Sequence, residues 1–319
     1  MNRLLFFAII VLFASCGYEF DPKVDNSISL VIAVDGTESD QVNYHDVVSK
    51  RVTQFGVDFV LSPASSELIL TVPEFSDVDR IRQIIQSKAK IEIKPVPPKE
   101  ELEGILETLN ERIRNSLILD KSIEYDTTVP LASWNPLFNW SKHDLYGIIT
   151  KGQLGVFSPR DTTRINSYLA KSNIKNKYPV EFKWGADFAI TETEFVNEAV
   201  LYAVYTDNQN TLLNEDILNA KATAKESEER LSNVSMQLTK TGGDKFYELT
   251  KSMIGEHLAI MVNDLVITSP VVGAPIEGGK VEISGPYTEN EVQDLAAILN
   301  SGNFNATVRI IDEVVNKVE

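Results

Sequence analysis

The order of short elements between residues 27 and 97 constrains the fold of this chain more than any other feature. Runs of strand-forming residues alternate with two segments whose apolar residues recur at helical spacing. In chain order we expect a strand over 27–35, a helix over 41–56, strands over 57–62 and 67–72, a helix bearing Val78, Ile81, Ile84 and Ile85, and a strand over 89–96. This β-α-β-β-α-β order predicts an α+β fold, in which an antiparallel sheet carries both helices on one face.

Local signals mark the ends of these elements, whose order is that of the ferredoxin-like layout. Gly56 is placed to end the first helix, because glycine adopts the positive φ of a helix C-cap without steric cost. Ser76 followed by Asp79 resembles a capping box that begins the second helix. Three prolines between residues 95 and 98 cannot continue a central strand, so we expect the ferredoxin-like base to comprise residues 27–97.

Residues 98–197 are expected to form a connecting α/β insert. Its first part is a helix over residues 99–117, in which apolar side chains recur at helical spacing. All three tryptophans of the chain, Trp134, Trp140 and Trp184, follow this helix. Clustered aromatic residues either form a peptide-binding surface or fill a core, and we favour the core because that is their commoner role.

Residues 198–315 show a second succession of strands and helices, which predicts an α+β head subdomain. Asn263 and Asp264 tolerate the positive φ of a tight turn, so the apolar runs on either side should form a hairpin. Thr288 and Glu291 have the spacing of a capping box for a helix that stops at Gly302. A strand over 306–314 is expected to end the subdomain. The apolar face of an earlier helix is expected to comprise Phe246, Leu249, Met253 and Ile254.

The N-terminus resembles a bacterial lipoprotein leader. A basic residue precedes an apolar run over residues 4–14, which is shorter than the roughly 20 residues that a membrane-spanning helix needs. Cys16, the only cysteine, follows the letters FAS, where a lipobox places its acylated cysteine. We therefore expect residues 1–15 to be a signal peptide, Cys16 to carry lipid and residues 16–26 to be a tether. The alternative is an ordinary signal peptide that contains a cysteine.

The charge of the chain limits the classes of partner. Its 46 acidic and 30 basic residues give a formal net charge of −16. Phosphate backbones and anionic lipid headgroups repel such a surface, so we expect no nucleic-acid partner. No segment after Cys16 is apolar over enough residues to span a bilayer, so we expect the membrane to be reached through the lipid anchor.

The sequence contains no recognisable pattern of catalytic, cofactor-binding or metal-binding residues. His45, His143 and His257 lie far apart, and none has a cysteine or carboxylate at the spacing of metal ligands. Nucleophile elbows, phosphate-binding loops and dinucleotide-binding fingerprints are absent. Acidic residues such as Asp264 and Glu277 are abundant, and solvated surfaces explain them better than catalysis does. We therefore expect neither an enzyme nor a cofactor, with a hydrolase as the least favoured alternative.

The last third of the chain contains a set of residues whose order and spacing are characteristic: Gly242, Thr250, Gly255, Pro270, Gly278, Gly279, Gly285 and Gly302. With these residues it resembles the head subdomain of P1, the first extracytoplasmic domain of SecD in the SecD/SecDF protein-export family. The stretches SKRVTQFGVDFVL and ELILTVPEF resemble the base of the same domain, which is ferredoxin-like in that family. In the family this domain is flanked by transmembrane helices. Here Cys16 stands in place of the first helix, so we expect a stand-alone lipoprotein.

The resemblance implies binding rather than catalysis. We expect a lipid-anchored protein of the cell envelope, whose partners are exported or unfolded polypeptides, the Sec translocon or components of envelope assembly. Gly17 stands where some inner-membrane lipoproteins have aspartate. This favours the periplasmic face of the outer membrane, with the outer leaflet of the inner membrane as the alternative. A structural scaffold in an outer-membrane complex is the alternative function, because a fold does not fix a function.

Overall fold

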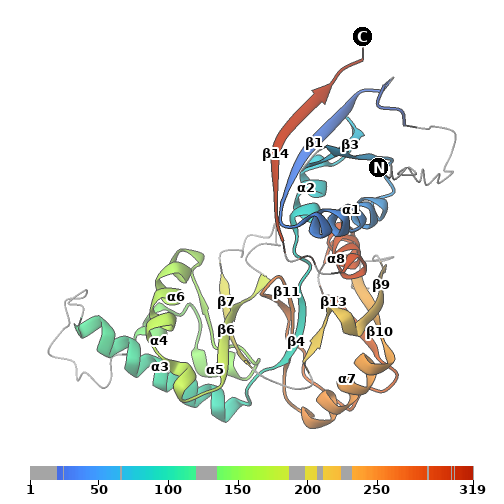
Figure 1. Cartoon of the computed structure of the whole chain (residues 1–319). Coiled ribbons are helices and arrows are strands. Elements are labelled where there is room, and N and C mark those ends of the chain that lie inside the picture. Colours follow the sequence, from blue (N-terminus) through green and yellow to red (C-terminus); the bar gives the residue numbers. More distant parts are fainter. Residues whose placement is uncertain are drawn as a thin grey trace. The chain divides into compact units, whose positions relative to one another are not determined.

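The computed structural model describes residues 20–318 except residues 24, 65–66, 120–134, 187–197, 207–210, 224–231, 286, 303 and 305. The chain divides into two compact units, which are drawn in Figure 1. The terminal unit combines Met1–Gln86 with Ala306–Glu319, and the central unit comprises Ser87–Asn305. The expected signal peptide, Cys16 and the first part of the tether lie outside the described residues. Within the described ranges, no helix is both long and apolar enough to cross a membrane.

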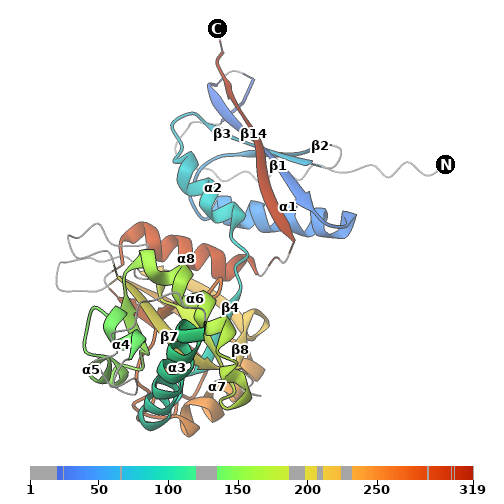
Figure 2. The ribbon, with the colours of Figure 1, turned by 90° about the vertical axis from the view of Figure 1, so that its left-hand side faces the viewer.

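The described residues of the terminal unit form a four-stranded sheet and two helices in the predicted β-α-β-β-α-β order. These elements are β1 (Ser27–Asp35), α1 (Glu38–Thr53), β2 (Val60–Ala64), β3 (Glu67–Pro73), α2 (Val78–Gln86) and β14 (Thr307–Asn316). The strands lie in the order β14-β1-β3-β2, and every neighbouring pair is antiparallel. Both helices cover the same face of this sheet (Figure 2). The α+β class and the ferredoxin-like layout are therefore confirmed.

The last strand of this sheet is not the predicted one. We expected residues 89–96 to close the sheet and residues 306–314 to end the head, but β14 pairs with β1 along the whole of β1. β4 (Ile91–Pro95) pairs instead with β11 (Leu258–Val262) and β8 (Leu212–Leu213) in the central unit. All residues of β4 are buried, so this strand needs a layer on each face. In the described part of the terminal unit, both helices lie on the same face of the sheet.

The core of the terminal unit lies between the sheet and its helices. Leu30 and Ile32 of β1 and Leu70 of β3 are completely buried, as are Val48 of α1 and Ile85 of α2. Alternate residues of β1 point to this core, which is the pattern of a sheet with one covered face. The helical spacing that predicted α1 and α2 therefore identified their buried sides.

The beginning of α2 differs from the prediction. The Arg80 N–H donates to Oδ1 of Asp77 at 3.1 Å, so Asp77 rather than Ser76 caps the helix. The Ser76 hydroxyl has no hydrogen-bond partner among the described residues, and the Asp79 carboxylate accepts from Arg82 at 2.7 Å. Because Asp and Ser are both good caps, spacing alone favoured the wrong one of two adjacent residues.

In its described part, the central unit contains three sheets. Its remaining strands are β5 (Gly155–Phe157), β6 (Val180–Trp184), β7 (Ala199–Tyr205), β9 (Ile217–Thr223), β10 (Ser232–Leu238), β12 (Leu265–Thr268) and β13 (Lys280–Gly285). Its helices are α3 (Lys99–Leu119), α4 (Pro136–Trp140), α5 (Leu145–Ile149), α6 (Thr162–Lys171), α7 (Lys240–Ser252), α8 (Glu289–Ser301) and the 3-10 turns Pro159–Asp161, Ile174–Asn176 and Asn214–Asp216. The strand orders are β12-β11-β4-β8, β13-β10-β9 and β5-β7-β6.

The sheet β12-β11-β4-β8 separates two hydrophobic cores. Ile93 of β4 and Ile260 of β11 face a core that also receives side chains from β10, β13, α7 and α8. Ala259 and Met261 of β11 face the opposite core, which is built by α3, α5, α6 and the sheet β5-β7-β6. This sheet therefore joins the expected insert and the expected head into one compact unit.

Two turn and capping predictions for this unit are confirmed. Asn263 and Asp264 have φ values of 52° and 67° in the turn between β11 and β12. Thr288 and Glu291 form the expected capping box, in which the side chain of each accepts a backbone N–H of the other at the start of α8. These features depend only on residues a few positions apart.

The structure agrees with the prediction for the two described tryptophans and differs from the prediction for the apolar face of α7. Trp140 and Trp184 pack against the margin of a core, as we favoured, and Trp134 lies outside the described residues. Ile254 was expected on the buried face of α7, but its side chain is 54% exposed. The helix ends at Ser252, so the helical spacing no longer applies to Ile254.

Candidate functional site

The first turn of α7 packs directly on the backbone of the 3-10 turn that precedes β9. The Thr239 hydroxyl caps the helix by accepting the Gly242 N–H at 3.0 Å. A Cβ atom on Gly242 would lie 2.5 Å from the carbonyl oxygen of Asp216, so only glycine allows this approach. The Lys245 ammonium donates to both oxygens of the buried Asp216 carboxylate at 3.0 Å. These contacts fix the start of α7.

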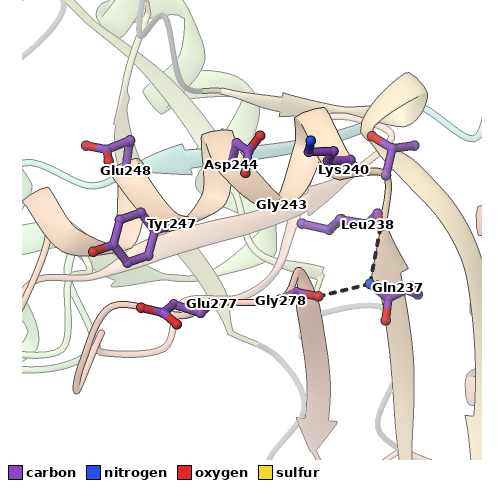
Figure 3. A pocket seen from close by; sticks show the side chains of 10 residues that line it. Gln237, Leu238, Lys240, Gly243, Asp244, Tyr247, Glu248, Glu277 and Gly278 are labelled. Atoms are coloured by element: carbon purple, nitrogen blue, oxygen red, sulfur yellow. Dashed lines mark hydrogen bonds between the residues drawn. The ribbon is translucent and has the colours of Figure 1, made fainter.

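Two glycines allow the loop of residues 271–279, which precedes β13, to lie against the same end of α7. Gly278 and Gly279 have φ values of 76° and 63°, in the left-handed region that favours glycine. A Cβ atom on Gly279 would lie 3.2 Å from Cα of Gly243 in α7. Gln237 of β10 holds the loop by donating from Nε2 to the Gly278 carbonyl oxygen at 3.1 Å (Figure 3). The loop therefore touches the backbone of α7 at Gly243 and is joined to β10 through Gln237.

Thr250 attaches the other end of this loop to α7. Its completely buried side chain donates to the Phe246 carbonyl oxygen at 2.8 Å and accepts the Ile276 N–H at 2.9 Å. Gly255, with φ 84°, donates its N–H to the Val272 carbonyl oxygen at 2.8 Å. The loop from Val272 onwards is thus held along the second half of the helix.

The helix and the loop border a surface pocket of about 760 Å³. Asp244 and Tyr247 line it from α7, and Glu277 lines it from the loop (Figure 3). Lys240 and Glu248 also belong to the lining, so three carboxylates stand against one ammonium group. The charged side chains are exposed and Tyr247 is half-buried. A pocket with this lining can bind a cationic group but offers no obvious pair of reacting groups.

Six of the eight residues that carry the sequence resemblance gather around α7 and its loop. They are Gly242, Thr250, Gly255, Pro270, Gly278 and Gly279. Pro270 accepts the Leu258 N–H at 3.0 Å, just before the loop begins. Gly285 pairs with Ser232 at the far end of β13, and Gly302 follows α8 with φ 77°. Cys16 lies outside the described residues.

The sequence analysis did not identify the pocket. Asp244, Tyr247 and Glu248 lie three or four residues apart in α7, a spacing that places them on one face of a helix. This signal was available in the sequence. Glu277 could not be assigned to the same site, because its position depends on the path of the loop.

A second group of charges connects the central sheet to β6. Lys94 of β4 binds Glu181 of β6 at 2.6 Å and Glu92 at 3.1 Å, and Lys183 binds Asp264 at 2.6 Å. The hydrogen bond from Lys183 holds the pKa of the Asp264 carboxyl below its ordinary value. Burial raises the pKa of Glu92, but hydrogen bonds from two lysines outweigh it and hold this pKa below its ordinary value. These contacts join the hairpin β11–β12 to β6.

The histidines contact separate partners. His143 lies 3.0 Å from a carboxylate oxygen of Glu198, and Nδ1 of His257 lies 2.8 Å from the Ser269 carbonyl oxygen. In the parts of the chain that the structure describes, no three His, Cys, Asp or Glu side chains are grouped so that they could hold a metal ion.

The segment that builds the pocket has known relatives. Residues 192–306 match the family described as SecDF, P1 head subdomain. Over this segment the chain is similar to the P1 head of the SecD/SecDF family, and SecD proteins are among its relatives. The protein translocase subunit SecD of Rhodothermus marinus is 22% identical over 284 residues, which are 84% of this chain and 45% of that protein. SecD of Magnetococcus marinus is 35% identical over 112 residues, which are 35% of this chain and 21% of that protein. The chain thus spans less than half the length of these SecD relatives.

A solved SecDF structure shares the fold. The crystal structure of SecDF in its super-membrane-facing form matches with a TM-score of 0.51 and 17% identity, over 94% of this chain and 32% of that chain. This likeness concerns the fold and not the chemistry of individual residues. The segment matched to the P1 head, residues 192–306, includes α7, the loop and all residues that line the pocket.

Proposed function

We propose that the chain binds segments of exported polypeptide in the cell envelope and so assists protein export, with the Sec translocon as a partner. The observation that carries this proposal is the match of residues 192–306 to the SecDF P1 head subdomain. Two relatives of the chain are named protein translocase subunit SecD. The glycine contacts that fix α7 to its loop support the proposal, because a preformed surface loses little freedom when it binds an extended segment.

Lipid attachment at Cys16 is the second part of the proposal. The short apolar leader directly before the only cysteine supports it. Acyl chains gain about 0.8 kcal/mol for each buried methylene, so two or more chains hold a protein firmly at a membrane. A protein with a formal net charge of −16 gains nothing from anionic headgroups, and the anchor would therefore supply the attachment. We place the protein on the periplasmic face of the outer membrane.

Crosslinking in cells tests the binding function. A photoreactive residue replaces Leu218 of the central unit, which is 64% exposed, or Ile311 of the terminal unit, which is 47% exposed. We expect irradiation to join exported polypeptides or translocon subunits to the central unit, and samples without irradiation are the control. If neither class of protein is recovered from these positions or from Tyr247 and Ile276 beside the pocket, the proposal is wrong.

A scaffold in an envelope complex is a second candidate function, and β14 favours it. This strand lies at the edge of its sheet, and its side chains Ile311, Val314 and Val315 are 47%, 42% and 52% exposed. Apolar strands at a sheet edge are sites where another chain can add a strand. Purification through this chain distinguishes the candidates, because a scaffold would bring a stoichiometric complex without exported polypeptide.

A further inference from the structure

Three exposed apolar side chains lie along the loop beside α7. Ile254 follows the helix and is 54% exposed, and Val271 is 55% exposed. Val271 directly precedes Val272, whose backbone is bridged to Ile254. Ile276, which is 36% exposed, is held against the helix by its hydrogen bond to Thr250. We refer to Ile254, Val271 and Ile276 as the apolar strip.

The apolar strip leads directly to the acidic pocket. Ile276 precedes Glu277, which lines the pocket together with Tyr247 of α7 (Figure 3). From residue 271 to residue 277 the chain spans at most about 20 Å, which is the length of an extended segment of about six residues. A single exposed apolar residue is ordinary, but several beside a pocket are typical of a binding surface.

The charges of the pocket determine which segment fits this surface. Asp244, Glu248 and Glu277 line the pocket together with Lys240, and Lys251 lies 3.8 Å from Glu248. Neither Asp244 nor Glu277 forms an ion pair within the described residues. The formal net charge of −16 adds to this negative field. A lysine or arginine side chain of a bound segment could pair with Asp244 and Glu277, while its aliphatic part lies beside Tyr247, whose ring also contacts Lys251. An acidic segment would be repelled.

We propose that the pocket and the apolar strip bind one extended polypeptide segment that carries a lysine or arginine next to apolar residues. The basic side chain enters the pocket, and the apolar residues lie on the strip. This inference rests on the proposed function and adds to it the chemistry of the bound segment. The attraction between opposite charges speeds encounter and weakens as salt screens it.

Binding of two synthetic peptides to the full chain tests the inference. The peptides share their apolar residues, and one has lysines where the other has glutamates. Fluorescence anisotropy measures both affinities at low and at high salt. We expect the lysine peptide to bind about three- to tenfold more tightly at low salt, as one or two exposed ion pairs allow, and the preference to decrease at high salt. Equal affinities, or no binding of either peptide, would overturn the inference.

Matched variants locate the binding surface. Asp244→Asn with Glu277→Gln removes two carboxylates from the pocket, and Glu107→Gln with Glu111→Gln removes two exposed carboxylates from α3. We expect only the first pair to remove most of the preference for the lysine peptide. Ile254→Ser should weaken both peptides alike, because it changes the apolar strip and no charge. If the two double variants behave alike, the site is not this pocket.

Crosslinking in cells separates the failure of this inference from the failure of the proposed function. A photoreactive residue in place of Tyr247 or Ile276 should capture exported polypeptides. If the Leu218 position captures them and these two positions do not, the inference is wrong while the proposed function stands. If no position captures polypeptide, both are wrong.

Discussion

Arg51 of α1 donates a 2.8 Å hydrogen bond to the carbonyl oxygen of Ile84 in the last turn of α2. The Arg51 side chain is completely buried, and this burial lowers its pKa to about 10. Tyr44 of α1 donates to the Ile85 carbonyl oxygen at 2.7 Å. One helix of the terminal unit therefore satisfies the carbonyl groups that the end of the other leaves without intrahelical partners.

Arg51→Met should destabilise the terminal unit. Methionine fills much of the space but removes a donor from a buried carbonyl group, which costs about 1–3 kcal/mol of unfolding free energy. Hydrogen exchange of the amides in β1 and β3 measures the effect, because it reports on this unit separately. Lys50→Met, at an exposed neighbouring position of α1, is the control and should change stability by less than about 0.5 kcal/mol. Equal exchange rates in the two variants would contradict the capping role of Arg51.

Gly242→Ala should destabilise the central unit. In an exposed helix this change usually stabilises by up to about 1 kcal/mol, but here the new Cβ atom would lie 2.5 Å from the Asp216 carbonyl oxygen. We expect a loss of about 1–3 kcal/mol, because α7 must move away. Urea unfolding followed by tryptophan fluorescence measures it, since all three tryptophans belong to this unit.

Gly273→Ala is the matched control for this change, because a Cβ atom there meets nothing within 4 Å. It should leave the urea midpoint unchanged. A Gly242→Ala chain as stable as the Gly273→Ala chain would show that the backbone contact at the start of α7 can relax without cost.

Features that depend on neighbouring residues could be predicted from the sequence. β1 has the predicted bounds, and the positive φ values of Asn263 and Asp264 follow from residue types that tolerate them. The capping box of α8 is another such feature. In each case the interacting groups are separated by a few residues, so the local pattern contains the whole interaction.

Strand pairing and the pocket could not be predicted in the same way. β4 has the composition of a strand, but its pairing with β11 joins residues far apart in the chain, such as Ile93 and Ile260. The ferredoxin-like sheet is closed instead by the C-terminal β14. One wall of the pocket could be inferred from the helical spacing of Asp244 and Tyr247, whereas Glu277 reaches it only through the path of the loop.

Lys94→Met should destabilise the central unit through its ion-pair network. The Lys94 side chain is 9% exposed and binds Glu92 and Glu181. Removing one partner of a buried ion pair costs about 3–5 kcal/mol, but each carboxylate keeps a second lysine, so we expect a loss of about 1–3 kcal/mol. Tryptophan fluorescence in urea measures it. Lys99→Met removes a lysine that is 53% exposed and lies 3.8 Å from Glu103, and this control should lose less than about 1 kcal/mol.

The pH dependence of unfolding should report on Asp264. The hydrogen bond from Lys183 holds its pKa below the ordinary value, so the folded chain binds fewer protons than the unfolded chain as the pH approaches about 4. The stabilisation is fully present above the ordinary pKa and is lost as the pH falls through the lowered one. Asp264→Asn should therefore show a smaller fall in urea midpoint below about pH 4, while asparagine retains the tolerance for positive φ. Asp244→Asn is the control, and equal profiles for the two variants would refute the role of Asp264.

Cys16→Ala should release the chain from the membrane fraction. If lipid on Cys16 is the anchor, the unaltered chain has an acylated N-terminal cysteine, and mass analysis of the N-terminus detects both the cleavage and the added lipid. Gly17→Asp is the matched variant, because it retains the cysteine and should move the lipidated chain from the outer to the inner membrane. If the Cys16→Ala chain stays with the membrane, or if the unaltered chain carries no lipid, then the leader is an ordinary signal peptide or the attachment comes from another contact.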